Sequence, residues 1–403
     1  MATLTRKRGV VPAATVSVTR KEPAAAQFYA TCPRGLAAAL AEELAALGAA
    51  STRAGDAGVD FEGPFELAYA ANLESRLATR ILWRVARFDY RKEQDIYEGA
   101  RRVPWHAHFG LERTFKVDTN AVKAPLKSID FITLRVKDAI ADAFRDALSR
   151  RPDVAAREPD VRVHVFLDAK WCTLYLDTSG EPLFKRGRRE QMGEAPLKKN
   201  LAAGLLRLSG WTPAQPLLDP MCGAGTILVE AAEMALELAP GRDRPFGFEK
   251  LTRFDAAAWE KVKSASAARA QPVAPRRIYG SDLYGRTLEA ARANLRDMGL
   301  EEVVALKQAN LLDLSAPAEQ GVLVTNPPYG VRLGEKEELA RFYPELGHLL
   351  KQRFAGWTAC IFSGDPELPR RIRLAPSRRT VLYNGALECR LYEYRMVAGA
   401  NRK

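Results

Sequence analysis

The chain contains 403 residues, and its 61 Lys and Arg against 49 Asp and Glu give a formal net charge of +12 at pH 7. The 47% hydrophobic and 27% charged residues are typical of a globular protein with two or three domains and exclude a chain that is disordered throughout. No apolar run reaches the roughly 18 residues of a membrane-spanning helix, and the basic N-terminus lacks the pattern of a secretory signal. We therefore expect a cytoplasmic protein without a membrane partner.

The five cysteines are scattered along the chain and include no CxxC pair. This pattern excludes a disulfide framework and the usual spacing of zinc ligands, so we expect reduced thiols and no metal. The excess of positive charge indicates a polyanionic partner without identifying it.

The predicted elements begin after a basic, flexible tail at residues 1–25, which sustains no period. Leucines recur at helical spacing over 36–47, and Gly48 stands where a helix commonly ends. A short strand over 58–61 follows, and the spacing then predicts a second amphipathic helix over 65–82.

The next segment continues with a strand over 114–119 and a long amphipathic helix over 128–148. Two alternating runs, 161–167 and 171–176, are separated by three residues and read as a β-hairpin with one buried face. We expect this α+β module to end near residue 180.

From residue 196 onward, strands and helices alternate, which is typical of a parallel sheet covered by helices on both faces. The predicted strands are 216–219, 278–282, 303–307, 322–325 and 357–363, and the predicted helices are 197–208, 226–238, 286–298 and 342–354. The last two strands, 380–383 and 389–396, lie so close in sequence that they must pair as an antiparallel hairpin. The predicted fold class is therefore α/β, with an α+β module preceding the parallel sheet.

A glycine turn follows the predicted strand that ends at Asp219. Gly223 and Gly225 allow the backbone to approach a ligand closely, and the free N–H groups at the start of the next helix favour a carboxylate or phosphate. A tight turn without a ligand is the alternative, but Asp282 ends the next strand, where a carboxylate can accept from the hydroxyls of a ribose. The interval between the two acids far exceeds the roughly 20 residues of a dinucleotide fingerprint. We assign the excess to an insertion at 239–275, which has enough aromatics to pack as a subdomain.

A second turn, Asn326-Pro-Pro-Tyr329, lies at the carboxyl end of the strand over 322–325. The two prolines fix the backbone and remove two donors, so local carbonyls point outward as acceptors. Asn326 adds a side-chain acceptor, and Tyr329 adds a flat face for stacking. These groups suit a planar exocyclic amine, because accepting its two hydrogens aims the nitrogen lone pair at an electrophile. A purely structural turn is the alternative.

Together, these features resemble class I S-adenosylmethionine-dependent methyltransferases that act on exocyclic amines. The resemblance implies that the glycine turn holds the methionine part of the cofactor, Asp282 holds its ribose, and its adenine lies near Leu283. The implied catalytic residues are Asn326, Pro327, Pro328 and Tyr329. The implied cofactor-binding residues are Asp219, Pro220, Cys222, Gly223, Ala224, Gly225, Thr226, Asp282, Leu283, Asn310, Leu311 and Asn326. Adenine, cytosine and guanine methylases share the second turn, so it specifies the chemistry rather than the base.

Motifs in the first half extend the resemblance to THUMP-containing RNA methyltransferases, above all the large-subunit ribosomal RNA guanine-N2 methyltransferase family RlmL. These motifs are 28–36, 60–63, 75–80, 136–140, 176–180, 186–188 and 195–198. The implied domains are a ferredoxin-like region at 26–66 completed by part of 67–110, a THUMP RNA-binding domain at 67–180, a basic linker at 181–195 and a Rossmann-like methyltransferase domain at 196–397.

The family resemblance implies methyl transfer from S-adenosylmethionine to the N2 amine of a guanine in 23S ribosomal RNA, with the guanine turned out of its helix. The residues predicted to contact RNA are Lys185, Arg186, Arg188, Arg189 and Lys198. Some family members carry a second methyltransferase, whereas this sequence has one glycine turn and one Asn-Pro-Pro-Tyr turn and resembles the single-activity form. A tRNA guanine-N2 methyltransferase of the same architecture and a non-catalytic RNA-binding factor for ribosome assembly are the alternatives.

Overall fold

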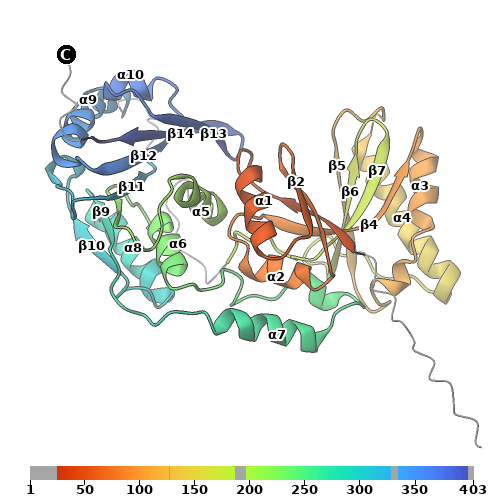
Figure 1. Cartoon of the computed structure of the whole chain (residues 1–403). Helices are drawn as coiled ribbons and strands as arrows, with labels where there is room; N and C mark the ends of the chain where they lie inside the picture. Colours follow the sequence, from red (N-terminus) through yellow and green to blue (C-terminus); the bar gives the residue numbers. More distant parts are fainter. Residues whose placement is uncertain (1–24, 127, 187–196, 328–334, 398–403) are drawn as a thin grey trace, which may run out of the picture.

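The computed structural model describes residues 25–126, 128–186, 197–327 and 335–397. Figure 1 shows two sheets side by side, one in the N-terminal part (25–186) and one in the C-terminal part (197–397). Each sheet has seven strands, in the orders β2-β3-β1-β4-β7-β6-β5 and β10-β9-β8-β11-β12-β14-β13. The predicted α/β fold class is confirmed.

The N-terminal part forms one continuous sheet because β4 joins its two halves. β1 pairs antiparallel with β3 and β4, and β4 pairs antiparallel with β7. The predicted hairpin is confirmed as β6 and β7, and β5 lies parallel to β6. The elements are β1 (Ala26–Thr31), α1 (Ala37–Ala46), β2 (Ser51–Ala54), β3 (Gly58–Gly63), α2 (Leu67–Glu74), β4 (Arg80–Asp89), α3 (Glu93–Arg101), η1 (Trp105–Ala107), β5 (Phe115–Ala121), α4 (Ile129–Leu148), β6 (Val161–Leu167) and β7 (Trp171–Asp177).

The sequence-based expectations for this part miss β1, β2, β4 and α3, and they extend one helix too far. β1 was not expected, because its short alternation adjoins the Ala-rich tail. The helix expected over 65–82 is wrong beyond Glu74: Ser75 is extended, with φ −67° and ψ 123°, and β4 begins at Arg80. Leu77 and Ile81 are buried from a loop and from the strand, so the apparent helical spacing comes from two elements that share one core.

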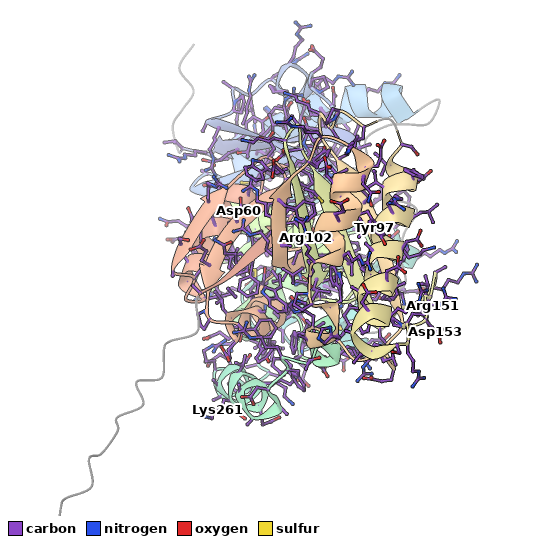
Figure 2. All side chains as sticks on the ribbon, turned by 90° about the vertical axis from the view of Figure 1, so that its right-hand side faces the viewer. Asp60, Tyr97, Arg102, Arg151, Asp153 and Lys261 are labelled. Carbon is purple, nitrogen blue, oxygen red and sulfur yellow. The ribbon has the colours of Figure 1, made fainter. Side chains whose placement is uncertain are left out.

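The helices α1, α2, α3 and α4 cover one face of this sheet. Phe28 is opposite Trp83, and Trp83 is opposite Leu176, so the register places these buried side chains on the helical face. Figure 2 shows α3 and α4 side by side, with Tyr97 on α3. The Tyr97 hydroxyl donates to Asp142 Oδ2 of α4 at 2.7 Å, which ties the two helices together.

The C-terminal part forms a sheet that is buried on both faces. Leu217 and Val322 belong to the core on one face, and Leu218 and Leu323 belong to the core on the other, where Leu346 of α9 lies. Strands β8 to β12 are parallel, and the predicted hairpin is confirmed as antiparallel β13 and β14. The elements are α5 (Lys199–Leu208), β8 (Leu217–Asp219), α6 (Thr226–Ala235), η2 (Gly247–Lys250), α7 (Ala256–Ala267), β9 (Ile278–Asp282), α8 (Gly285–Asp297), β10 (Val304–Gln308), η3 (Leu311–Asp313), β11 (Gly321–Thr325), α9 (Glu335–Arg353), β12 (Trp357–Ser363), α10 (Leu368–Ile372), β13 (Arg378–Asn384) and β14 (Leu387–Arg395).

The insertion does not pack as a subdomain of its own. Its Phe248 and Trp259 surround Tyr69 of α2, at ring-centroid distances of 4.5 and 6.0 Å. The Tyr69 hydroxyl also accepts from the backbone N–H of Asp255 at 2.9 Å. The insertion therefore joins the C-terminal part to the N-terminal part through a shared aromatic core.

Candidate active site

The predicted site residues follow four neighbouring parallel strands. Asp219 ends β8, Asp282 ends β9, Asn310 follows β10 and Asn326 follows β11. The strand order β10-β9-β8-β11 brings the carboxyl ends of these strands to one edge of the sheet. Ligands of open parallel sheets bind at this edge.

The glycine turn between β8 and α6 adopts a conformation that requires glycine. Gly223 has φ +55° and Gly225 has φ +82°, both in the left-handed region. A Cβ on Gly225 would lie 3.1 Å from the Cβ of Ala291 in α8, so this position is tight as well as strained. A Cβ on Gly223 would meet no described atom within 4 Å, so the turn leaves open space on that side.

Asp282 is bonded directly to the glycine turn. Its Oδ2 accepts from the backbone N–H of Gly223 at 3.0 Å, and its Oδ1 accepts from that of Tyr284 at 3.0 Å. A carboxylate has about four acceptor sites, so Asp282 can still accept from ligand hydroxyls. The structure thus brings together the acid and the turn that the sequence places in separate elements.

Asp219 connects the glycine turn to the strand that leads into the second turn. Its Oδ1 accepts from the Thr325 hydroxyl at 2.9 Å and from the backbone N–H of Met221 at 3.3 Å. Burial is the main cause that raises the pKa of Asp219 to about 7, against the effect of these two hydrogen bonds. Thr325 was not singled out from the sequence, because its partner lies 106 residues away.

The rim beyond Asp282 combines exposed apolar groups with a capped turn. Leu283 and Tyr284 are 52% and 68% exposed, whereas Leu311 is buried. The Asn310 side-chain oxygen accepts from the backbone N–H of Leu312 at 3.0 Å and so caps η3. The sequence predicts Leu283, Asn310 and Leu311 as cofactor-binding residues here, but Tyr284 is not among the predicted residues. A large aromatic residue two positions after Asp282 could have indicated it.

The second turn is only partly described. Asn326 and Pro327 directly follow β11, whereas Pro328 and Tyr329 lie outside the described residues. Among the other predicted cofactor residues, Cys222 is buried, and burial raises the pKa of its thiol. A nucleophilic thiolate is therefore not favoured at Cys222.

Arg186 is the predicted RNA contact that the structure contradicts. Its guanidinium is 2% exposed and forms a bidentate ion pair with Glu230 of α6, with distances of 3.2 Å from Nε to Oε1 and 2.7 Å from Nη2 to Oε2. The carboxylate of Glu230 attracts the arginine inward, where RNA cannot reach it. Lys185 and Lys198 are exposed, and Arg188 and Arg189 lie outside the described residues.

The Arg186–Glu230 pair belongs to a buried ionic cluster between the two parts of the chain. Arg76, which follows α2, lies 3.5 Å from Glu230 and 3.5 Å from Glu233. Arg242 of the insertion lies 2.7 Å from Glu233. Burial alone would raise the pKa of Glu233, but Arg76 and Arg242 hold it below its ordinary value. Both glutamates belong to the helix that begins at the glycine turn, so the cluster fixes that helix against the N-terminal part.

The described ranges contain neither a candidate membrane-spanning helix nor a candidate metal centre. No helix among them is both long and apolar enough to cross a membrane. No group of three or more His, Cys, Asp or Glu side chains among them is arranged to hold a metal ion.

Three segments of the chain match known protein families. Residues 186–393 match the RMKL-like methyltransferase domain, residues 90–177 match the THUMP domain, and residues 27–82 match the RlmL ferredoxin-like domain.

Two curated relatives align with nearly the whole chain. The chain is 40% identical over 381 residues to "Ribosomal RNA large subunit methyltransferase K/L" of Shewanella loihica, which covers 93% of this chain and 54% of that protein. It is 39% identical over 370 residues to "Putative RNA methyltransferase slr0064" of Synechocystis sp., which covers 92% of this chain and 96% of that protein. The chain thus spans about half the length of the K/L relative.

The crystal structure of SMU.472 complexed with SAH has the same fold. It matches with a TM-score of 0.85 at 32% identity, over 92% of this chain and 98% of that chain.

Proposed function

This chain belongs to the family that carries the RMKL-like methyltransferase domain, and we propose that it transfers a methyl group from S-adenosylmethionine to the N2 amine of a guanine in large-subunit ribosomal RNA. The observation that carries the proposal is the 2.9 Å hydrogen bond from the Thr325 hydroxyl to Asp219. It holds the strand that ends before Asn326 against the strand that enters the glycine turn. A methyl donor bound at the glycine turn would therefore lie beside the group that receives the target amine.

The residues of the glycine turn fit S-adenosylmethionine. Open space beside Gly223 admits the methionine part, and the acceptor sites of Asp282 that remain suit two ribose hydroxyls. The exposed Leu283 and Tyr284 offer an apolar surface to the adenine ring. When bound, the cofactor supplies an electrophilic methyl group on a sulfonium.

Asn326 and Pro327 would position the target guanine. The Asn326 side-chain oxygen and the Pro327 carbonyl accept the two hydrogens of N2, which directs the nitrogen lone pair toward the methyl group. This positioning supplies most of the rate acceleration. Enzymes that act on a base take it out of its helix, so the guanine reaches the turn as an unpaired base.

The choice of RNA rests on the N-terminal part of the chain. A THUMP match at residues 90–177 accompanies the methyltransferase match, and the chain carries a net charge of +12. Basic proteins attract nucleic acid through its phosphates. The relative named for the ribosomal large subunit directs the proposal to that RNA.

Methyl transfer from labelled S-adenosylmethionine tests the substrate. The acceptors compared would be protein-free large-subunit RNA, assembled large subunits, tRNA and DNA, each at equal concentration. We expect label in the large-subunit RNA, either free or in the subunit. Label confined to tRNA would replace the proposed substrate, and failure to bind the cofactor by calorimetry would refute the enzyme itself.

A further inference from the structure

The first sheet is covered by helices on one face, and its other face carries a continuous row of polar and aromatic side chains. Residues paired directly across strands point to the same face of a sheet. Asp60 of β3 is opposite Tyr29 of β1, which is opposite Leu82 of β4. Arg84, on the same face of β4 as Leu82, is opposite Tyr175 of β7. This open face therefore runs from the ferredoxin-like match into the THUMP match.

A cleft of about 430 Å³ lies on this open face. Its lining includes the arginines at positions 53, 80, 84 and 87, the carboxylates Asp60 and Asp168, and the aromatic rings of Tyr29, Phe166 and Tyr175. Its lining belongs to the first sheet and shares no residue with the proposed active site at the edge of the second sheet, and nothing in the proposed chemistry uses it.

The two carboxylates of the cleft are already engaged. Asp60 pairs with Arg53 at 3.1 Å. Oδ1 of Asp168 accepts from the backbone N–H groups of Lys170 and Trp171 at 2.8 and 2.7 Å. Asp60 is therefore neutralised by Arg53, and Asp168, whose oxygen is held by the backbone, forms no ion pair with Arg84 or Arg87 among the described residues.

Arg84 and Arg87 are the cations of the cleft that are available to a ligand. Neither forms an ion pair with any residue in the part of the chain that the structure describes. The Arg87 guanidinium lies over the Trp171 ring, 4.8 Å from its centroid, which orients the group without neutralising its charge. The cleft therefore presents two positive charges to an anion.

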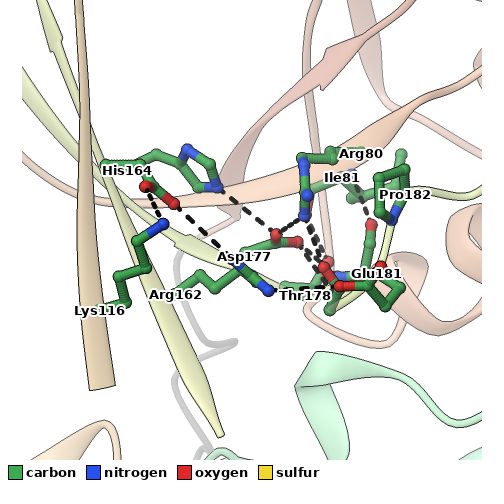
Figure 3. Close-up of polar contacts among 12 residues, drawn as sticks. Arg80, Ile81, Lys116, Arg162, His164, Asp177, Thr178, Glu181 and Pro182 are labelled. Atoms are coloured by element: carbon green, nitrogen blue, oxygen red, sulfur yellow. Dashed lines mark hydrogen bonds and ion pairs between the residues drawn. The ribbon is translucent and has the colours of Figure 1, made fainter. Parts of the chain in front are cut away.

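Arg80, by contrast, is held by the protein itself. Figure 3 shows it against the buried Asp177, with His164 on the other side of the carboxylate. The His164 Nε2 lies 3.5 Å from Asp177 Oδ2, and Oδ1 accepts from the backbone N–H of Ser179 at 2.8 Å. Arg80 thus lines the cleft with its charge already paired, so a ligand anion would bind at Arg84 and Arg87.

The aromatic rings narrow the chemistry of the ligand. Phe166 is 37% exposed, and the same lining contains Tyr29 and the buried Tyr175, whose rings lie 6.2 Å apart. Flat side chains on an open sheet face, next to unneutralised arginines, suit bases that stack and phosphates that pair. An acidic peptide would use the arginines but would leave the rings without a partner. A duplex would offer phosphates but keep its bases inside the helix.

We propose that this cleft binds unpaired nucleotides of the RNA substrate, with a base on Phe166 and the flanking phosphates at Arg84 and Arg87. The proposal rests on the proposed function in one respect only, namely that the substrate is RNA. The cleft would be a second binding site for the RNA, which contacts a single-stranded segment away from the base that is methylated.

The test measures binding of a fluorescent oligouridine of about ten nucleotides by anisotropy, with an RNA hairpin as comparison. Phe166→Ala should weaken oligouridine binding about five- to 150-fold, the range for loss of one stacked base. Arg84→Ala should lower the slope of log K against log salt by about 0.7, as expected for one lost phosphate contact on a single strand. Arg102→Ala is the matched control, because Arg102 directly follows α3 on the helical face and its side chain is 80% exposed.

The control variant should bind like the unmodified protein, and thermal melting should show all variants folded. Equal binding by all variants, or losses no larger than that of Arg102→Ala, would overturn the proposal. So would binding of an acidic peptide in place of oligouridine. Methyl transfer measured in parallel separates the two hypotheses. If no RNA is methylated but Phe166→Ala still weakens oligouridine binding, only the proposed function fails. If RNA is methylated and both Phe166→Ala and Arg84→Ala bind oligouridine normally, only the cleft proposal fails.

Discussion

Arg186→Met should destabilise the protein by about 3 kcal/mol, because it leaves the Glu230 carboxylate buried with a weaker partner. The guanidinium and the carboxylate are 2% and 0% exposed, and their pairing is bidentate. Removing one member of such a pair costs about 3–5 kcal/mol. We expect the lower limit because Arg76 still lies 3.5 Å from Glu230. The bond from Lys199 Nζ to the backbone carbonyl at position 186 would remain, so the loss is confined to the side chain.

Urea denaturation of the variant and of Lys185→Met measures this cost. Lys185 is the matched control, since it precedes Arg186 and its ion pair with Glu181 is 60% and 53% exposed. An exposed pair of this kind contributes about 0–1 kcal/mol. A cost below about 1 kcal/mol for Arg186→Met would refute the assignment, because a buried pair broken on one side is far more costly.

The cost should also depend on pH. Burial raises the pKa of Glu230 and Arg186 opposes that rise, so the variant's folded pKa should lie still higher. A carboxyl group whose pKa is higher in the folded than in the unfolded state contributes stability at low pH and loses it as pH rises. The destabilisation should therefore be smaller at about pH 5 than at about pH 8.

Two further predictions concern the proposed cofactor site. The pKa of Asp219 in the folded protein, about 7, exceeds its ordinary value of 3.8. The free energy of unfolding, measured by urea denaturation, should therefore fall as pH rises between these two values, and Asp219→Asn should show no such fall. Equal pH profiles of the two proteins would contradict the argument that burial raises this pKa. Gly225→Ala should lower the affinity for S-adenosylmethionine by calorimetry, since φ is +82° and its Cβ would lie 3.1 Å from Ala291. Gly210 has a similar φ of +73°, but a Cβ there would meet no described atom within 4 Å, so Gly210→Ala should leave the affinity unchanged. Equal losses of affinity in the two variants would show that backbone strain alone is responsible.

The strands that form the edge of the proposed active site could be predicted from the sequence, because each is a short apolar run that ends in a polar or glycine-rich turn. The turn at Gly223, the acid Asp282 and the turn at Asn326 follow such runs, and the structure brings their strands to one edge. The bond between Thr325 and Asp219 could not be predicted, since local periodicity carries no information on which distant side chains meet.

Burial of charge was equally hidden from the sequence. Arg186 stands in a basic segment that looks solvated, and its partner Glu230 lies within an apolar helix. Neither neighbourhood indicates the ion pair, which exists because the two parts of the chain pack together. The apparent helix over 65–82 fails for the same reason: residues of a loop and a strand share a core with a helix.

Nucleoside analysis of the methylated RNA tests the central claim most directly. Large-subunit RNA treated with the protein and labelled S-adenosylmethionine would be digested completely, and the labelled nucleoside identified by mass spectrometry and chromatography. We expect N2-methylguanosine from the unmodified protein and at most traces from Asn326→Ala, with cofactor affinity retained. Label at another position of guanine or in another base would contradict the proposed role of the Asn326 turn. Undiminished methyl transfer by Asn326→Ala would contradict it as well.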